Sequence, residues 1–138
     1  MIRTATAHWQ GNLKDGKGNL STKSQILDKT KYSFRARFQG DEKATNPEEL
    51  LAAAHAGCFT MSVASILDKK GFKSISLDTL ATLTLEGLAI TEINLSISGS
   101  IPNLDIDEFN AIVLEAEKTC IVSKALKVTI TSDAHLVV

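Results

Sequence analysis

The longest apolar run of the chain lies in its middle and predicts one long helix. From Leu50 to Leu67 there is no Asp, Glu, Lys or Arg, whereas charged residues crowd both ends of this run. Asn46 is a suitable N-cap, Pro47 fits the first helical position, and Gly71 stands where helices commonly end. The run holds five alanines and several polar residues, which favours a buried core helix over a membrane span.

Alternating apolar and polar residues predict strands on both sides of this helix. Before it, strands are expected at 3–10, 20–27 and 31–39, with Tyr32, Phe34, Ala36 and Phe38 on one face of the last and Arg35 and Arg37 on the other. After it, two strands containing Ile75–Leu85 and Ile93–Ile97 are joined by a turn at 86–88. A second helix is expected from Asp105, which forms a capping-box pattern with Glu108, and a final strand covers 126–137.

This order of elements predicts an α+β fold with a largely antiparallel sheet packed on the long central helix and on the second helix. The length of 138 residues suits a single domain spanning 1–138. A helix that is apolar on most sides must be covered on most sides. We therefore expect a partner subunit to supply part of that cover.

Composition excludes several classes of partner. The net charge is -1 and the basic residues are spread along the chain, so neither nucleic acid nor an anionic membrane surface is expected as a partner. The N-terminal segment alternates polar and apolar residues and lacks the pattern of a signal peptide, which favours the cytoplasm. In that reducing compartment a purely structural disulfide between Cys58 and Cys120 is not expected.

Two interpretations of the cysteines stay open on these patterns. Both can be small buried apolar residues. Alternatively, one is a nucleophile, which requires a nearby cation because an apolar setting alone makes a thiol inert. Lowering a thiol pKa from about 8.5 to about 6 takes roughly 3.4 kcal/mol. Arg35 or Arg37 could supply that cation, held in place by Glu48 or Glu49 just downstream.

Other chemistries have weaker support in the sequence. His55 and Cys58 stand one helical turn apart, but no CxxC or HxxxH pair accompanies them, so no metal site is predicted. His55 fits better as a packed histidine with one hydrogen-bonded nitrogen. Glycine-rich phosphate loops and a nucleophile elbow are absent from the sequence.

The stretch TNPEELLAAAHAGCF at 45–59 resembles the signature helix of the osmotically inducible protein C / organic hydroperoxide resistance family. The matches AHW at 7–9, GKG at 16–18, RFQG at 37–40 and C-x-V-S at 120–123 extend the resemblance over nearly the whole chain. The AHW and AAHAGCF segments are closer to the osmotically inducible branch. The resemblance implies an intertwined homodimer and a thiol peroxidase that reduces organic hydroperoxides to alcohols in oxidative or osmotic stress.

The resemblance also assigns roles to four residues. It places the peroxidatic cysteine at Cys58, the resolving cysteine at Cys120, the arginine at Arg37 and the glutamate at Glu48. The reaction that this implies would turn Cys58 into a sulfenic acid, with which Cys120 would condense, and an external dithiol would reduce the disulfide, with no metal, haem or flavin required. The family commonly has proline after the second cysteine, where this chain has Ile121.

One geometric difficulty follows from these assignments. Ten residues of unbroken helix put Glu48 about 15 Å from Cys58 along the axis and about 80° around it. Either the helix breaks, with Gly57 the best place, or Arg37 and Glu48 come from the partner subunit, which we prefer. The rival to an enzyme is a dimeric stress protein or apolar-ligand carrier whose cysteines are only buried.

Overall fold

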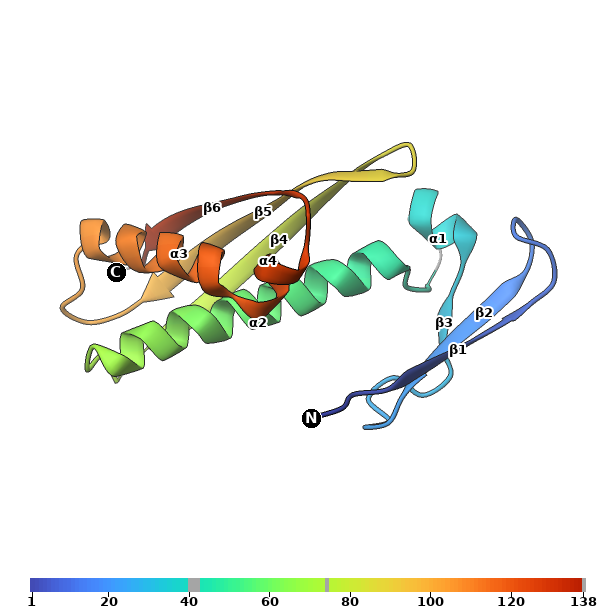
Figure 1. The fold of residues 1–138 in the computed structure, drawn as a ribbon, viewed down its shortest axis with the longest axis horizontal. Helices are drawn as coiled ribbons and strands as arrows, with labels where there is room; N and C mark the ends of the chain where they lie inside the picture. The colour runs from blue at the N-terminus through green and yellow to red at the C-terminus, as the bar shows by residue number, and fades with distance from the viewer. Residues whose placement is uncertain (40–42, 74, 138) are drawn as a thin grey trace. The chain divides into compact units, whose positions relative to one another are not determined.

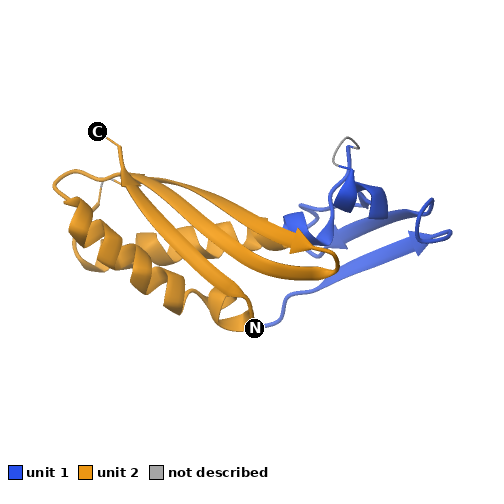
Figure 2. Ribbon diagram, turned by 90° about the horizontal axis from the view of Figure 1, so that it is seen from above, with its two compact units in different colours: residues 1–50 blue, residues 51–138 orange. Residues whose placement is uncertain are grey.

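A computed structural model describes residues 1–39, 43–73 and 75–137. The chain divides into two compact units, Met1–Leu50 and Leu51–Val138, which are coloured separately in Figure 2. Gly40, the last residue of the RFQG match, lies outside the described ranges.

The N-terminal unit is built on a three-stranded antiparallel sheet. Strand β1 (Ala5–Gln10) pairs with β2 (Lys17–Thr22), and β2 pairs with β3 (Thr30–Tyr32) (Figure 1). The register places Trp9 and Tyr32 on either side of Gly18, and the two rings meet edge to face at 5.6 Å. A Cβ at Gly18 would approach Tyr32 Cε1 to 2.5 Å and Trp9 Cε3 to 2.6 Å. The glycine therefore makes room for this aromatic pair.

The strand expected at 31–39 is the main error of the sequence prediction. Only Thr30–Tyr32 is extended, and the chain then turns into the short helix α1 (Phe34–Phe38). Ser33 is its N-cap, and the Ser33 hydroxyl accepts a hydrogen bond from the Ala36 amide at 3.0 Å. Phe34 and Phe38, four residues apart, stack edge to face at 5.1 Å. A spacing of four residues between apolar side chains fits both the period of a strand and that of a helix. The Ser33 N-cap favours the helix.

Helix α2 (Pro47–Lys69) has the predicted bounds and runs without a break through Gly57. Asn46 caps it, since the Asn46 side-chain oxygen accepts a hydrogen bond from the Glu49 amide at 2.8 Å. Its length and composition would suit a membrane span. However, the stripe of His55, Phe59, Val63 and Leu67 is buried, as in a core helix. Much of the rest of its surface is exposed, and Met61 is 74% exposed.

The C-terminal unit packs helices on one face of a second three-stranded sheet. Strands β4 (Ser76–Glu86) and β5 (Ala89–Ser100) form an antiparallel hairpin, and β6 (Thr129–Leu136) pairs with β5 in parallel. Helix α3 (Ile106–Thr119) and the short α4 (Ile121–Ala125) connect β5 to β6 (Figure 1). The core side chains of β5 meet those of α2 and α3: Phe59, Val63, Leu67, Ile93, Leu95, Ile97, Phe109, Ile112, Val113 and Ala116.

The predicted α+β class is correct, as are the hairpin at 86–88 and the second helix with its Asp105 cap. The strands form two sheets instead of one. The pairing of β6 with β5 is parallel, which the long helical connection between them permits. Helix α4 was not predicted.

Candidate active site

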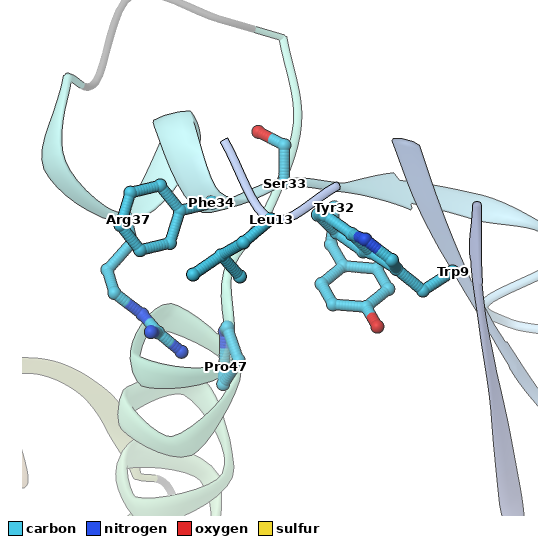
Figure 3. A pocket seen from close by; sticks show the side chains of 7 residues that line it. All are labelled: Trp9, Leu13, Tyr32, Ser33, Phe34, Arg37 and Pro47. Carbon is cyan, nitrogen blue, oxygen red and sulfur yellow. The ribbon is translucent and has the colours of Figure 1, made fainter. Parts of the chain in front are cut away.

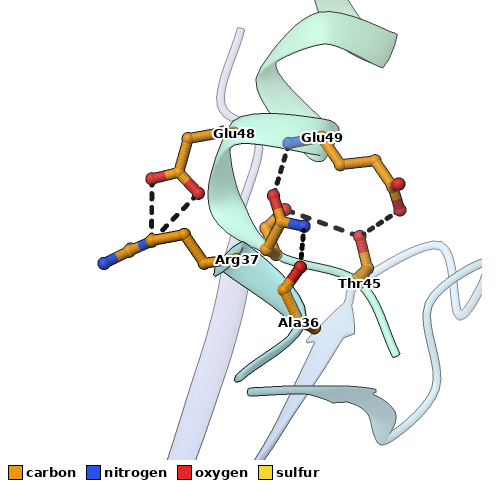
Figure 4. A network of polar contacts seen from close by, with 6 residues as sticks. Ala36, Arg37, Thr45, Glu48 and Glu49 are labelled. Atoms are coloured by element: carbon orange, nitrogen blue, oxygen red, sulfur yellow. Dashed lines mark hydrogen bonds and ion pairs between the residues drawn. The ribbon is translucent and has the colours of Figure 1, made fainter. Parts of the chain in front are cut away.

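An ion pair joins α1 to the first turn of α2. Arg37 Nε lies 3.0 Å from Glu48 Oε1 and 3.1 Å from Glu48 Oε2. Both side chains are largely shielded, with 27% of Arg37 and 18% of Glu48 exposed. Figure 4 shows the guanidinium extending away from the carboxylate beyond Nε. Four of the five guanidinium N–H donors therefore remain directed elsewhere.

Helix α1 gives the two candidate arginines different partners. On a strand, Arg35 and Arg37 would share a face. On a helix, side chains two residues apart point in nearly opposite directions. Arg35 pairs with Asp15 at 2.9 Å, and both side chains are more than half exposed. Only Arg37 pairs with one of the two predicted glutamates, Glu48.

Asn46 links α1 to the start of α2 by hydrogen bonds, a role that the sequence analysis did not predict. Besides capping α2, Asn46 donates through Nδ2 to the carbonyl of Ala36 at 3.0 Å. Glu49 is used locally, since its carboxylate accepts a hydrogen bond from the Thr45 hydroxyl at 2.9 Å (Figure 4). These contacts fix Ala36, and with it the adjacent Arg37, against the start of α2.

A pocket of about 220 Å³ opens beside Arg37 within the N-terminal unit. It is lined by Trp9, Leu13, Tyr32, Ser33, Phe34, Arg37 and Pro47 (Figure 3). Its walls are mainly aromatic and aliphatic, and one guanidinium carries the charge. Such a pocket can hold the apolar part of a ligand and place a polar group of that ligand next to the Arg37 guanidinium. The sequence analysis singled out Arg37 but predicted no pocket around it.

The two thiols lie together in the C-terminal unit. Both are free, and the side chains of Cys58 and Cys120 are within hydrogen-bonding reach of each other. Cys58 is half-buried on α2, whereas Cys120 is fully buried where α3 ends and α4 begins. The four predicted site residues thus form two pairs, one within each unit.

The surroundings of the two sulfurs in this unit favour charge on Cys120. Burial raises the pKa of Cys58, and the neighbouring Cys120 raises it further, while the amides of Val122 and Ile121 oppose this rise. Burial also disfavours the Cys120 thiolate. Hydrogen bonds to the Cys120 thiolate from the Ser123 amide, the Cys58 thiol and the Ser123 hydroxyl outweigh that effect and leave the pKa of Cys120 below its usual value.

His55 fits the sequence interpretation of a packed histidine with one bonded nitrogen. His55 is fully buried, and its Nε2 lies 2.7 Å from the Ser123 hydroxyl oxygen. Nδ1 has no hydrogen-bond partner among the described residues. Burial lowers the pKa of His55, which keeps its imidazole neutral. Within 1–39, 43–73 and 75–137, no three His, Cys, Asp or Glu side chains gather as a metal site would require.

Comparison with known proteins gives relatives along most of the chain. Peroxiredoxin OsmC of Escherichia coli strain K12 is 45% identical over 134 residues, which cover 94% of this chain and 93% of the relative. An organic hydroperoxide resistance protein-like relative from Staphylococcus aureus strain MSSA476 is 30% identical, covering 91% and 90% of the two chains. The difference in identity agrees with the predicted osmotically inducible branch.

Solved structures share the fold. An OsmC-like protein of unknown function from Vibrio cholerae superposes with a TM-score of 0.72 at 12% identity, covering 97% of this chain and 99% of the other. The OhrB protein of Bacillus subtilis gives 0.64 at 20% identity, covering 97% and 98%. The family described as OsmC-like protein matches residues 40–134. With a family match over most of its length and a relative at 45% identity, this chain belongs to the OsmC-like protein family.

Proposed function

We propose that the protein is a cysteine-based peroxidase that reduces organic hydroperoxides to alcohols. The observation that carries this proposal is the pair of free thiols held close together, with Cys120 in the hydrophobic core and Cys58 packed against it. Relatives named peroxiredoxin and organic hydroperoxide resistance protein-like support the same activity. A pair that served only as packing would have no need of the amide and hydroxyl donors around both sulfurs.

The proposed reaction begins at Cys58. Its thiolate attacks one peroxide oxygen, the O–O bond breaks, and the departing alkoxide takes a proton to become the alcohol. Cys58 is left as a sulfenic acid. Cys120 then attacks the Cys58 sulfur, the S–O bond breaks, and the disulfide and water form. An external dithiol restores both thiols by exchange, so the two electrons that reduce the peroxide come from that reductant.

Arg37 and Glu48 are proposed to activate the peroxide and the Cys58 thiolate. Glu48 engages Nε of Arg37, which leaves the terminal nitrogens available for a peroxide oxygen. Arginine suits this role because it stays charged when it is shielded from water. The aromatic pocket beside Arg37 would hold the apolar tail of the substrate (Figure 3).

We further propose a homodimer in which Arg37 and Glu48 of one subunit serve Cys58 of the other. Helix α2 is unbroken at Gly57, so the alternative of a helix break within one chain loses its support. Burial and the neighbouring Cys120 raise the pKa of Cys58 more than the amides of Val122 and Ile121 lower it, so this cysteine still needs a cation. The exposed apolar surface of α2, including Met61, is suited to burial against a second copy. We place this dimer in the cytoplasm, in defence against oxidative or osmotic stress.

A thiol titration tests the proposed activity. One equivalent of cumene hydroperoxide added to fully reduced protein should remove two free thiols per chain and leave a crosslink between Cys58 and Cys120 within one subunit. Cys58→Ser should lose turnover, while Cys120→Ser should complete one round and then stall. An unchanged thiol count in the wild-type protein would favour the carrier alternative. Multi-turnover activity in Cys58→Ser would also contradict the assignment.

A mixing experiment tests the shared site. Arg37→Ala and Cys58→Ser subunits are each expected to be inactive, but a heterodimer contains one site with both native residues. Unfolding and refolding the two variants together should restore part of the activity. Heterodimers that form and remain inactive would show that Arg37 does not act across the interface.

A further inference from the structure

Cys120, the proposed resolving thiol, lies at the end of a short chain of polar contacts. The reaction proposed above gives these contacts no role. His55 Nε2 lies 2.7 Å from Ser123 Oγ, and the Ser123 hydroxyl also hydrogen-bonds the Cys120 sulfur. Cys120 in turn meets Cys58. The chain of contacts thus begins and ends on α2, because His55 and Cys58 stand one turn apart on that helix.

The burial of His55 needs an explanation. Its side chain is fully buried, yet Nδ1 has no hydrogen-bond partner in the described part of the chain. A buried polar atom without a partner costs about 1–3 kcal/mol, so an apolar residue would serve packing better at this position. In a neutral imidazole whose Nε2 accepts from Ser123, Nδ1 carries the ring proton, so Nε2 is the nitrogen that can take up another proton.

We propose that His55 and Ser123 form a proton relay that removes the proton of Cys120 while this thiol attacks the sulfenic acid of Cys58. The inference rests on the peroxidase function proposed above. His55 bonds the Ser123 hydroxyl and would reach the Cys120 thiol through it, so it acts as a positioning and proton-accepting residue. Ser123 is the contact between this residue and the reacting thiol.

The hydrogen bonds of the relay are complete both before and after transfer. At rest, the Cys120 thiol donates to Ser123 Oγ, and the Ser123 hydroxyl donates to Nε2 of neutral His55. After transfer, Nε2 carries the proton and donates to Ser123 Oγ, while the hydroxyl donates to the Cys120 thiolate. A hydroxyl can make this exchange because it is donor and acceptor at once. The lowered pKa of His55 keeps it neutral and ready to accept at rest.

The step balances without any further reactant. The Cys120 thiolate forms the S–S bond as the S–O bond of the Cys58 sulfenic acid breaks and hydroxide leaves. That hydroxide becomes water by taking back the one proton that the relay had accepted. In sum, one sulfenic acid and one thiol give one disulfide and one water, and His55 ends neutral.

Single-turnover kinetics on the full-length reduced protein test the relay. One equivalent of cumene hydroperoxide is added, sulfenic acid is trapped with dimedone at set times, and the 58–120 disulfide is followed by mass spectrometry. His55→Gln retains a buried hydrogen-bonding side chain but cannot accept a proton. We expect it to form sulfenic acid at the wild-type rate and to form the disulfide about 10²-fold more slowly.

Variants at Ser123 separate a relay from a packing effect. Ser123→Ala removes the hydroxyl and should slow disulfide formation as His55→Gln does, whereas Ser123→Thr keeps the hydroxyl and should restore it. The solvent deuterium isotope effect on disulfide formation should be larger in the wild type than in His55→Gln. A purely structural role would leave that isotope effect unchanged. Melting temperatures of all variants are compared with the wild type.

The outcomes distinguish the two proposals. If the wild-type protein forms no sulfenic acid, the peroxidase function itself fails. If the wild type forms the acid and the disulfide, but His55→Gln condenses at the wild-type rate, the relay is wrong. The relay is also overturned if Ser123→Thr has the wild-type melting temperature and remains as slow as Ser123→Ala.

Discussion

Arg37 meets both carboxylate oxygens of Glu48 through a single nitrogen, at 3.0 and 3.1 Å from Nε. A pair that used the two terminal nitrogens would bind the carboxylate more fully but leave fewer donors for another ligand. The observed geometry instead holds the guanidinium through Nε alone, and Arg37 also helps to line the pocket. This arrangement suits an arginine that is held by one group in order to bind another.

Arg37→Lys should therefore impair the reaction although it keeps the charge. A single ammonium cannot contact Glu48 and also offer two fixed donors to a peroxide. We expect kcat/KM for cumene hydroperoxide, with dithiothreitol as reductant, to fall about 10²-fold, the effect of losing one preorganised donor at a reaction centre.

Arg35→Lys provides the matched control on the same helix. Arg35 makes an exposed pair with Asp15, and such pairs contribute at most about 1 kcal/mol to stability. Its kcat/KM should equal that of the wild type. Equal losses in the two variants would show that α1 tolerates no lysine, and the special role of Arg37 would then be withdrawn.

Ile121→Pro tests what the departure from the usual family proline does. Ile121 is the first residue of α4, a position where proline fits the helix without loss of an internal bond. However, the Ile121 amide also hydrogen-bonds the Cys58 sulfur and lowers its pKa. We expect Ile121→Pro to fold with unchanged or slightly higher melting temperature while the pKa of Cys58 rises.

The Cys58 pKa is read from the pH dependence of alkylation by iodoacetamide in a Cys120→Ser background, with and without Ile121→Pro. Ile121→Ala keeps the amide and serves as control, so its titration should match that of Ile121. If the Cys58 pKa is the same with and without Ile121→Pro, the Ile121 amide does not stabilise the Cys58 thiolate.

The sequence predicts best those elements whose ends carry a chemical signal. Asn46 and Asp105 cap α2 and α3 as expected, and Gly87 turns the β4–β5 hairpin with a positive φ of 61°. Helix α1 was missed because Phe34 and Phe38 fit two periods at once. The Ser33 cap was the only local sign of helix.

Long-range partners follow a different rule. The family resemblance pointed to Arg37 with Glu48, and their pairing is close in sequence across one short connection. No pattern along the chain relates His55 to Ser123, which lie 68 residues apart. Likewise, alternation identifies strands but not their neighbours, so the division into two sheets could not be foreseen.

Met61→Asp should separate the proposed dimer without unfolding the subunit. Met61 is 74% exposed in the single chain, on a helix that carries no charge from Leu50 to Leu67. A carboxylate there costs little in a free subunit, but burying it unpaired against a partner costs several kcal/mol. Light scattering after size-exclusion chromatography should give a dimer for the wild type and a folded monomer for the variant.

Leu114→Asp is the control for this experiment. Leu114 is 51% exposed on α3 and is not part of the apolar run of α2. It should remain dimeric. The proposal that α2 lies in a dimer interface is contradicted if the wild-type protein is monomeric in solution or if Met61→Asp stays dimeric.

The burial of neutral His55 predicts that stability falls as the pH is lowered from 7.5 to 5.5. Burial lowers the pKa of His55 below its usual 6.5, so in this range the unfolded chain takes up a proton that the folded chain refuses. Since the unfolded state binds more protons, the free energy of unfolding decreases with falling pH. One such proton contributes at most about 1.4 kcal/mol per pH unit. The loss begins near pH 6.5 and continues down to the folded-state pKa.

Urea unfolding at several pH values measures this slope, and His55→Gln should flatten it because glutamine does not titrate. His8→Gln, a change on an exposed position of β1, should keep the wild-type slope. Asp68 and Asp133 do not interfere above pH 5, because their pKa values lie below the usual 3.8 through hydrogen bonds with Lys73 and Ser96. If His55→Gln retains the full wild-type slope, another group refuses the proton, and His55 is not the neutral imidazole on which the relay depends.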